Sequence, residues 1–465
     1  MTEKVSRALT VYVSGNSCNL QCPYCYVKNS HPNETPKPMC LKYPLKQMIH
    51  AFDPRRIGGI AEVTVIGSAE TLLTKEVVPF VHGLLHFGHV VTVVSNATLP
   101  ARVDELLDCP KEDLKNLILK ASFHYEELKR RQLLDVYFQN IKNAISHGAS
   151  AYPFVVISPE YSKHIKEIGE LITENLGIKA HCSPCNSINN EFDLQFHSEF
   201  DPKPTEKLME ELDHYFDTRI YRECVRYKEV DVQNTFCYAG RWSLGIDMAT
   251  GDTFKCHNFR KDNENFYESV DKPYQWGIPI GMSCAIESCC LQYNFFSENI
   301  LPAFPGKYSY GQLLYQKGMI SEYTRDKLDV KFDEIYGRET PGKETEIALA
   351  NKNIQIRRLE NELMKSEIGN PFLSPKVSEM VRNGKRIAVY GIGGLYKKYK
   401  VQATVEISCF LDSYAEGVGS FEGKKVYRPD KLPEKQKYFI VTCATDRSTL
   451  YENLRKAGFS RDQYI

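Results

Sequence analysis

Short apolar runs alternate with amphipathic segments over the first 185 residues of this chain. The apolar runs have the length of buried strands and cover Leu9–Val13, Val63–Ile66, Val90–Val94, Leu117–Ser122 and Phe154–Ile157. Amphipathic segments such as Lys75–Phe87 and Gln139–His147 lie between them. This alternation predicts β/α units around a parallel sheet. A closed eight-fold barrel needs roughly 250 residues, so we expect a partial (β/α)6 barrel over residues 1–185.

A second α/β pattern begins at Gly384, where the strand-like run Lys385–Tyr390 leads into a glycine-rich turn. Gly391 and Gly393 open this turn, and Tyr396 stands where a third glycine of the dinucleotide-binding pattern would lie. Two further strand-like runs and a final helix complete a half-Rossmann-like unit over residues 384–465. The two glycines are candidate nucleotide contacts, and a pure docking role for the unit is the alternative.

Between these regions the chain divides into two further segments. Residues 186–300 are rich in cysteine, and residues 301–383 are predicted to form a helical linker. Within the linker, apolar residues repeat at heptad-like spacing at Leu349, Ile356, Leu359 and Leu363. The span is short for a coiled coil, but it could form the seam of a homodimer.

Composition excludes several classes of function. The chain has 465 residues, with 59 basic and 59 acidic side chains and no net charge. This balance gives no electrostatic case for nucleic-acid or membrane binding. No apolar run reaches about 18 residues, and the N-terminus lacks the apolar core of a signal peptide. The fifteen cysteines therefore indicate a reducing, cytoplasmic setting, where clustered cysteines favour metal over disulfides.

Three cysteines follow the first predicted strand at positions i, i+4 and i+7: Cys18, Cys22 and Cys25. Thiolates at this spacing can hold an iron–sulfur cluster. Three ligands leave one iron of a [4Fe–4S] cluster open, and an open metal position is typical of a reactive site. Zinc is the alternative, but the nearest further ligand, His31, is isolated.

The spacing C-x3-C-x2-C, with Tyr24 before the last cysteine, resembles the signature of the radical S-adenosylmethionine (radical SAM) enzymes. The resemblance implies that the open iron binds SAM and that one electron cleaves it to a 5′-deoxyadenosyl radical. It also implies the partial barrel, with the cluster after the first strand. An electron donor such as flavodoxin or ferredoxin would then be a partner.

The same resemblance assigns roles to residues at the ends of the next strands. Residues 67–71, Gly-Ser-Ala-Glu-Thr, lie where the family has a Gly-Gly-Glu-Pro motif that receives the amino group of SAM. The implied SAM contacts are Tyr24, Gly67, Ser68, Glu70, Ser95, Asn96 and Ser122. His124 is the candidate catalytic residue because it ends the fourth strand beside this site, and a polar loop histidine is the alternative.

The cysteine-rich segment predicts a second metal centre. Cys237 and Cys256 frame a likely β-hairpin, whose turn contains Gly251, and a hairpin brings its ends together. Further thiols follow at Cys284, Cys289 and Cys290. The pattern resembles the SPASM or twitch extension of radical SAM enzymes and implies one auxiliary [4Fe–4S] cluster.

The preferred ligands of this cluster are Cys237, Cys256, Cys284 and Cys290, with Cys289 as the rival to Cys290. A structural zinc site is the alternative. Cys182 and Cys185 could assist a cluster or simply pack. The remaining thiols are expected to be ordinary and buried: Cys40, Cys109, Cys224, Cys409 and Cys443.

Two classes of function stay open, a radical SAM enzyme and a non-catalytic metal- or nucleotide-binding regulator. Within the enzyme class, SPASM and twitch relatives often act on peptides, which favours a peptide or protein maturase. The Rossmann-like unit instead favours a sugar or another small metabolite, and this is the preferred substrate class. The sequence leaves the reaction that follows hydrogen abstraction open.

Overall fold

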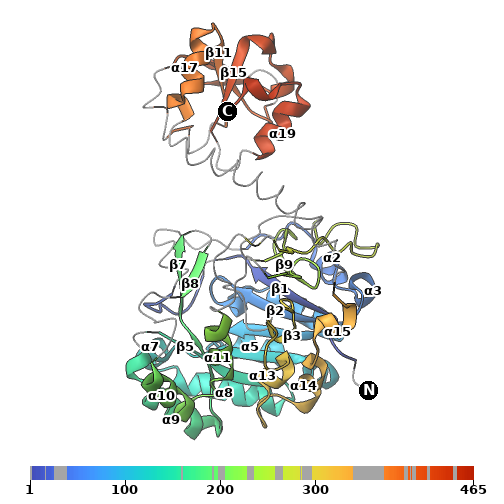
Figure 1. Cartoon of the computed structure of the whole chain (residues 1–465), viewed down its shortest axis with the longest axis vertical. Coiled ribbons are helices and arrows are strands. Elements are labelled where there is room, and N and C mark those ends of the chain that lie inside the picture. Colours follow the sequence, from blue (N-terminus) through green and yellow to red (C-terminus); the bar gives the residue numbers. More distant parts are fainter. Residues whose placement is uncertain are drawn as a thin grey trace. The chain divides into compact units, whose positions relative to one another are not determined.

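The computed structural model divides the chain into two compact units, Met1–Lys352 and Asn353–Ile465 (Figure 1). Each unit has its own sheet and its own hydrophobic clusters. The structure describes residues 3–15, 17–25, 39–158, 161–190, 193–196, 205–227, 235–256, 265–282, 284, 296–338, 371–391, 396–397, 400, 405–415, 419–443 and 448–465. The predicted linker repeat over residues 349–363 lies outside these ranges.

The first unit is built on an eight-stranded sheet with the order β10-β9-β1-β2-β3-β4-β5-β6. All neighbours from β9 to β6 run parallel, and only β10 is antiparallel to β9. The strands are β1 (Arg7–Val13), β2 (Ala61–Gly67), β3 (Val90–Ser95), β4 (Leu117–Ser122), β5 (Ser150–Ile157), β6 (His181–Pro184), β9 (Ser243–Asp247) and β10 (Thr253–Phe254). The order does not return to its first strand among the described residues, so the predicted partial barrel is confirmed.

Helices connect the parallel strands, as a right-handed β/α pattern requires. They are α2 (Leu45–His50), α3 (Pro54–Ile57), η1 (Thr71–Leu73), α4 (Val77–His86), α5 (Pro100–Leu107), α6 (Lys111–Leu114), α7 (Tyr125–Arg130), α8 (Leu134–Ser146), η2 (Tyr161–Lys163) and α9 (Ile165–Leu176). Proline at the first turn starts α3 and α5, where its missing N–H costs nothing. Gly177 ends α9 in the left-handed conformation, at φ 69°.

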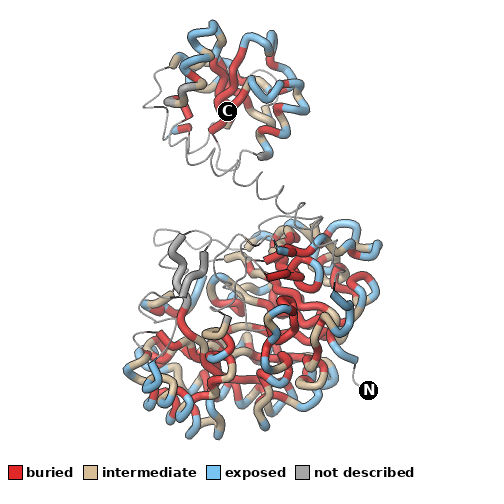
Figure 2. The backbone as a smooth tube through the Cα atoms, in the orientation of Figure 1, coloured by how far each residue is buried: buried red, intermediate tan, exposed pale blue. Residues whose placement is uncertain are grey.

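The two faces of the sheet have different partners. Odd-numbered residues such as Leu9, Val63 and Val91 pack in one cluster with helix residues such as Phe80. Even-numbered residues such as Ala8, Val90, Ile118 and Tyr152 pack in a second cluster with side chains from residues 236–332. Strands buried on both faces explain the nearly continuous apolar runs in the sequence. Figure 2 shows buried backbone running through the centre of this unit.

Residues 301–338 correct a predicted boundary, because they belong to the first unit and not to a linker. The segment carries α13 (Tyr310–Leu314), α14 (Glu322–Leu328) and α15 (Phe332–Tyr336). Backbone hydrogen bonds join it to the barrel, from Ala151 N to Met319 O (3.0 Å) and from Val5 N to Lys327 O (3.1 Å). Several of its apolar side chains, among them Leu313, Leu328 and Phe332, are fully buried in the cluster on the even-numbered face of the sheet, which would otherwise be open to water.

Four more elements complete the first unit. Strands β7 (Asn186–Asn190) and β8 (Asp193–Phe196) form an antiparallel hairpin after β6. Helices α10 (Glu206–Tyr215) and α11 (Arg219–Tyr227) follow, and α11 packs on β6. None of the described helices is long and apolar enough to cross a membrane.

The second unit has a five-stranded sheet with the order β13-β14-β12-β11-β15. The unit contains η4 (Pro371–Leu373), α17 (Pro375–Arg382), β11 (Arg386–Tyr390), β12 (Ile407–Leu411), β13 (Gly419–Phe421), β14 (Lys424–Tyr427), η6 (Pro429–Lys431), η7 (Lys435–Lys437), β15 (Tyr438–Thr442), α19 (Ser448–Lys456) and η8 (Arg461–Gln463). Strands β12 and β15 flank β11 and run parallel to it, as a half-Rossmann-like unit requires. Phe372 and Val377 pack with Ile387 in its core, so the unit begins before the predicted residue 384.

Candidate functional site

The cysteine loop, residues 14–25, follows β1 at the carboxyl edge of the parallel sheet. Its start is fixed from two neighbouring strands. The Ser14 hydroxyl donates to Asp247 Oδ2 at the end of β9 (2.6 Å), and Glu70 N donates to Ser17 O (3.2 Å). Carboxyl ends of parallel strands are where such folds build their sites. The predicted loop therefore lies where chemistry is expected.

A closed ring of side-chain hydrogen bonds holds the middle of the cysteine loop. The Asn19 amide donates to Thr98 Oγ (2.8 Å) and accepts from the Asn96 amide (2.8 Å). Thr98 Oγ donates in turn to Asn96 Oδ1 (2.6 Å). Asn96 and Thr98 follow β3 and are buried. The predicted SAM contact Asn96 thus uses its side chain to fix the residue next to Cys18.

Glu70 joins the end of β2 to the end of β3. Its carboxylate accepts from Ser95 Oγ (2.6 Å), Asn96 N (2.7 Å) and Leu72 N (3.0 Å). Burial raises the pKa of Glu70, and these three hydrogen bonds oppose the rise. Two of the predicted SAM contacts, Glu70 and Ser95, are therefore hydrogen-bonded to each other. Together with Asn96 they form the side of the site next to the cysteine loop, here called the wall.

Glu127, at the third position of α7, fixes the loop from its other side. Its carboxylate accepts from the backbone N–H of Gln21, at 2.9 Å. Arg130 pairs with both carboxylate oxygens at 2.9 Å, and Arg131 Nε lies 3.0 Å from one of them. The hydrogen bonds from Arg130 lower the pKa of Glu127 to about 2, so the side chain is an anion. Gln21 stands directly before Cys22, so the Glu127 carboxylate restrains the backbone next to that thiol.

Tyr24 contacts the ends of β4 and β5. Its hydroxyl lies 2.6 Å from His124 Nδ1 and 3.2 Å from the Tyr161 hydroxyl. The Tyr24 and Tyr161 rings meet edge to face, with centroids 5.2 Å apart. Burial lowers the pKa of His124 to about 4, so its imidazole is neutral at pH 7. The structure thus brings Tyr24, the aromatic residue of the cysteine motif, into direct contact with His124, the candidate catalytic residue.

The three thiols differ in exposure: Cys18 is exposed, Cys22 is buried and Cys25 is half-buried. A turn brings the last two together, with Cys25 N donating to Cys22 O at 3.2 Å. Burial raises the pKa of Cys22 to about 12, and the neighbouring Cys18 and Cys25 add to the rise. The thiols are thus close enough to influence one another and would be stabilised as thiolates by positive iron.

Three thiols on one short loop have the donor chemistry of an iron–sulfur cluster, which takes each thiolate on a different iron. Cys18, Cys22 and Cys25 are the residues that would hold it.

Three further predicted contacts lie on the same edge. The Gly67 N–H donates to Thr71 Oγ at 2.9 Å, and a Cβ at Gly67 would lie 3.2 Å from that oxygen. Ser68 is exposed and Ser122 is half-buried. In the described part of the chain, neither serine side chain forms a hydrogen bond, so both hydroxyls are free for a ligand.

The cysteine-rich segment places its described thiols in one apolar cluster. Cys237 and Cys256 are buried there, and Cys284 packs against it half-buried. Cys237 forms a bridge with Gly281, with hydrogen bonds of 3.0 and 2.9 Å, and the Cys284 thiol adds to the rise in the pKa of Cys237. The predicted hairpin between Cys237 and Cys256 is present as β9 and β10. Cys289 and Cys290 lie outside the described residues.

Three of the remaining cysteines are less buried than predicted. Cys40 is exposed, and Cys109 and Cys224 are half-buried, although all three were expected in the core. Cys40 lies on the segment leading to α2, away from the interior of the sheet. Cys409 and Cys443 are buried as predicted. Cys182 and Cys185, for which a role at a cluster and simple packing were both open, are buried too.

In the second unit, Gly391 directly follows β11 and has a φ of 96°, a conformation that favours glycine. A Cβ at this position would lie 2.8 Å from Cys443 O, so the loops after β11 and β15 approach closely there. Gly393, the other predicted nucleotide contact, lies outside the described residues.

Sequence reasoning missed four residues that hold the cysteine loop: Asn19, Glu127, Tyr161 and Asp247. Asn19 stands inside the three-cysteine motif and could have been suspected from that position. The other three lie 100 or more residues away in sequence, as the separations of 106 for Gln21–Glu127 and 137 for Tyr24–Tyr161 show. Only the fold reveals them.

Comparisons with known proteins give structural similarity alone. No protein-family model matches the chain, and no curated protein matches it. Streptococcus suis SuiB bound to precursor peptide SuiA is 17% identical over 58% of this chain and 65% of its own, with a TM-score of 0.40. Native anSMEcpe with bound AdoMet is 12% identical over 76% of this chain and 100% of its own, with a TM-score of 0.39. BtrN in complex with AdoMet and 2-DOIA is 13% identical over 56% of this chain and 75% of its own, with a TM-score of 0.28.

These solved structures are radical SAM enzymes, the family that the cysteine spacing resembles. The chain spans just under two thirds of the length of SuiB. All three TM-scores lie below 0.5, so the site's own residues, and not these similarities, carry the proposal of function.

Proposed function

We propose that this protein is a radical SAM enzyme in which Cys18, Cys22 and Cys25 hold a [4Fe–4S] cluster with one iron open to SAM. One observation carries the proposal. A three-cysteine loop lies at the carboxyl edge of a parallel sheet, held by the Asn19–Asn96–Thr98 ring and by Glu127. A structural zinc site would need a fourth ligand close by, whereas a [4Fe–4S] cluster with one open iron needs only these three thiolates.

When bound, the cluster and SAM supply the one-electron chemistry that removes a hydrogen atom from a substrate. The chain's own residues position these groups. The free hydroxyls of Ser68 and Ser122 would contact SAM, while Glu70, Ser95 and Asn96 keep the wall rigid. Neutral His124, fixed by Tyr24, is the proposed catalytic residue at this edge.

We infer a sugar or another small polar metabolite as substrate, with a peptide as the alternative. The inner, even-numbered face of the sheet supports this choice. Thr10, Thr64 and Thr92 lie side by side across β1, β2 and β3 on this face, and Lys120 lies on β4. Hydroxyl and ammonium groups suit a hydroxyl-rich ligand. An auxiliary cluster on Cys237, Cys256, Cys284 and Cys290 is proposed beside it.

Anaerobic reconstitution tests the proposal directly. Protein loaded with iron and sulfide should form 5′-deoxyadenosine from SAM when dithionite is the reductant. A protein that binds iron but forms none would favour the non-catalytic regulator. Adding candidate sugars or peptides should then raise 5′-deoxyadenosine formation only for the correct substrate class.

A further inference from the structure

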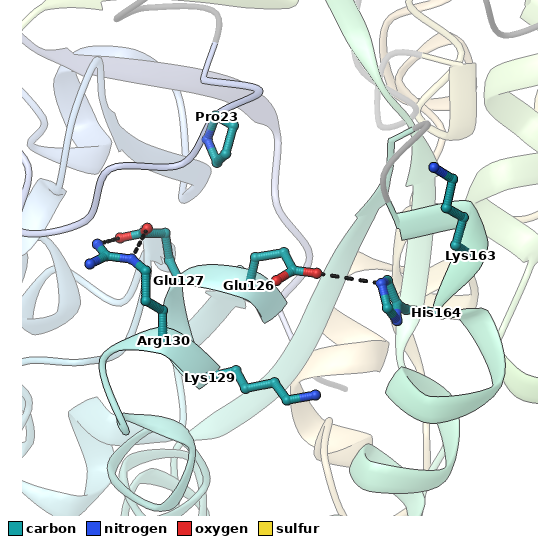
Figure 3. Close-up of a pocket in the computed structure, with 7 residues that line it drawn as sticks. All are labelled: Pro23, Glu126, Glu127, Lys129, Arg130, Lys163 and His164. Atoms are coloured by element: carbon teal, nitrogen blue, oxygen red, sulfur yellow. Dashed lines mark hydrogen bonds and ion pairs between the residues drawn. The ribbon is translucent and has the colours of Figure 1, made fainter.

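Carboxylates near the cysteine loop have partners for their charge. In a pocket of about 540 Å³ beside the loop, Glu127 pairs with Arg130, and Glu126 lies 3.5 Å from His164 (Figure 3). A buried polar group without such a partner costs free energy, and a bound ion is one of the explanations for it. Two carboxyls deeper in the first unit, those of Glu62 and Glu298, are of this second kind.

Glu62 and Glu298 approach each other from two different parts of the first unit. Glu62 lies on β2 in register with Ala8 and Val90, which belong to the cluster on the inner, even-numbered face of the sheet. Glu298 lies on the segment that covers this face, where Phe332 N donates to Glu298 O at 2.9 Å. The Glu62 charge adds to the rise in the pKa of Glu298, so the two carboxyls are within electrostatic reach of each other.

The oxygens of this pair are buried and largely unpartnered. Glu62 Oε2 and both carboxylate oxygens of Glu298 have no hydrogen-bond partner among the described residues. The Thr92 hydroxyl on β3 also lacks one there, and it lies close enough to Glu62 to lower the pKa of that carboxyl. One proton shared by the two carboxyls satisfies two of these four oxygens, whereas a cation between them can bind all four.

The charges around the pair favour a cation of low charge. Two ionised carboxyls bring two negative charges into a part of the protein where neither residue is more than 1% exposed. Lys120 on β4 offsets part of this charge, because its ammonium group lowers the pKa of Glu62. The same ammonium group lies 3.8 Å from the centre of the Phe154 ring. Carboxylate and hydroxyl oxygens are the donors that hard cations prefer.

We propose that Glu62, Glu298 and Thr92 bind a dehydrated alkali-metal cation, sodium or potassium, inside the first unit. The ion links β2 to the segment that carries Glu298 and so holds that segment against the inner face of the sheet. The proposal does not rest on SAM chemistry. Protons and the cation compete for the same oxygens, so the pair keeps a proton when no alkali cation is present.

Thermal unfolding of the holoprotein in three chloride salts tests this site. At pH 8 and equal ionic strength, the first unit should have a higher Tm in sodium or potassium chloride than in tetramethylammonium chloride, whose cation is too large to enter. The difference should be roughly 3 °C or more when the salt is at ten times its dissociation constant. Equal ionic strength keeps general screening the same. At pH 5 the difference should vanish, because protons then occupy the pair.

Glu298→Gln keeps the size of the side chain and removes one charge, so its Tm should be the same in all three salts. Glu112→Gln on α6 replaces an exposed carboxylate and is the matched control, which should keep the wild-type difference. A wild-type Tm that is the same in all three salts would overturn the proposal, because the pair would then hold only a proton. A difference that persists in Glu298→Gln would also overturn it, because the ion would then bind elsewhere.

If Glu298→Gln does not fold, Thr92→Val offers a milder change, because valine has the shape of threonine without its hydroxyl group. With one ligand lost, a higher concentration of the stabilising salt should be needed to reach the same rise in Tm at pH 8. An unchanged dependence on salt concentration would contradict the site, since Thr92 would then not bind the ion.

Discussion

Glu127 links the surface of α7 to the backbone of the cysteine loop. It has a charged partner in Arg130 and a backbone partner in Gln21 N–H. Groups that orient metal ligands typically contribute 10- to 100-fold to metal affinity. Glu127→Ala leaves the Gln21 N–H and two guanidinium groups without their acceptor, so it should lower iron retention at this site and slow SAM cleavage by roughly 10-fold or more.

Iron content after desalting and the EPR spectrum of the reduced, SAM-bound protein measure this effect. A positioning role predicts an altered spectrum even in molecules that keep their iron. Glu112→Ala on α6 removes an exposed carboxylate whose one ion pair among the described residues is with Lys115, and it serves as the control. Glu127→Ala with wild-type iron and spectrum would show that Glu127 stabilises α7 alone.

Two carboxyl groups lie deep in the first unit. Glu62 on β2 and Glu298 are 1% and 0% exposed. Thr64 Oγ donates to Glu62 at 2.7 Å, while the Glu298 oxygens have no hydrogen-bond partner among the described residues. Burial raises the pKa of Glu62 to about 7, opposed by Thr64, Thr92 and Lys120. Burial also holds the pKa of Glu298 well above its usual value, and the Glu62 charge adds to this.

These raised pKa values make stability depend on pH. A carboxyl whose pKa is higher in the folded than in the unfolded state stabilises the fold fully below the unfolded value, near 4.5, and loses that effect as the pH rises through the folded value. We therefore expect the Tm of the first unit to fall between pH 5 and 8, by about 2–4 °C for each kcal/mol lost. Thermal unfolding of wild type and Glu62→Gln checks this, because the glutamine variant should lose the part of the slope that Glu62 contributes. An unchanged slope in Glu62→Gln would assign the pH dependence to other groups.

At the scale of elements, periodicity predicted most of the sheet. Leu117–Ser122 matches an observed strand at both ends, and the other strands predicted in the first unit lie within observed ones. The predicted run Lys385–Tyr390 begins one residue before β11. The sixth strand, His181–Pro184, was missed because its short polar sequence lacks an apolar run. It is a strand because β5 pairs with it and α11 covers it, which is tertiary context that local sequence does not carry.

The thiols of the site were predictable from the sequence, whereas most of the hydrogen bonds that hold the cysteine loop were not. The cysteine spacing located the loop, and strand ends located Glu70, Ser95 and Asn96. Their hydrogen bonds to each other and to Asn19 were not predictable, because polar side chains at a strand end can face a ligand or a neighbouring loop equally well. The strand β9 was expected only as a hairpin arm, yet it also pairs with β1 and brings Asp247 to Ser14.

The β9–β10 hairpin gives the auxiliary site its own test. Cys237 lies before β9 and Cys256 follows β10, and both are buried in a cluster separate from the cysteine loop. Cys237→Ala should therefore remove about four irons while dithionite-driven SAM cleavage without substrate survives. Iron and zinc analysis decides between the alternatives. One zinc per chain in the isolated protein, with iron only at the first site, would favour a structural zinc centre.

At the scale of the whole molecule, the two units bury separate cores. In the part of the chain that the structure describes, each hydrophobic cluster contains residues of one unit only, and no strand of one sheet pairs with a strand of the other. A chain ending at Arg338 should thus keep both proposed iron–sulfur clusters and still cleave SAM with dithionite as the reductant. Iron content and 5′-deoxyadenosine formation measure this. Loss of iron on truncation would show that the second unit supports the first.

The most direct measurement compares wild type with a variant that lacks all three loop thiols. Anaerobically reconstituted wild type should hold about eight irons, in two [4Fe–4S] clusters, and form 5′-deoxyadenosine from SAM with dithionite. Cys18→Ala, Cys22→Ala and Cys25→Ala together should halve the iron and abolish 5′-deoxyadenosine formation. If the triple variant still formed 5′-deoxyadenosine, the cysteine loop would not be the site of SAM cleavage.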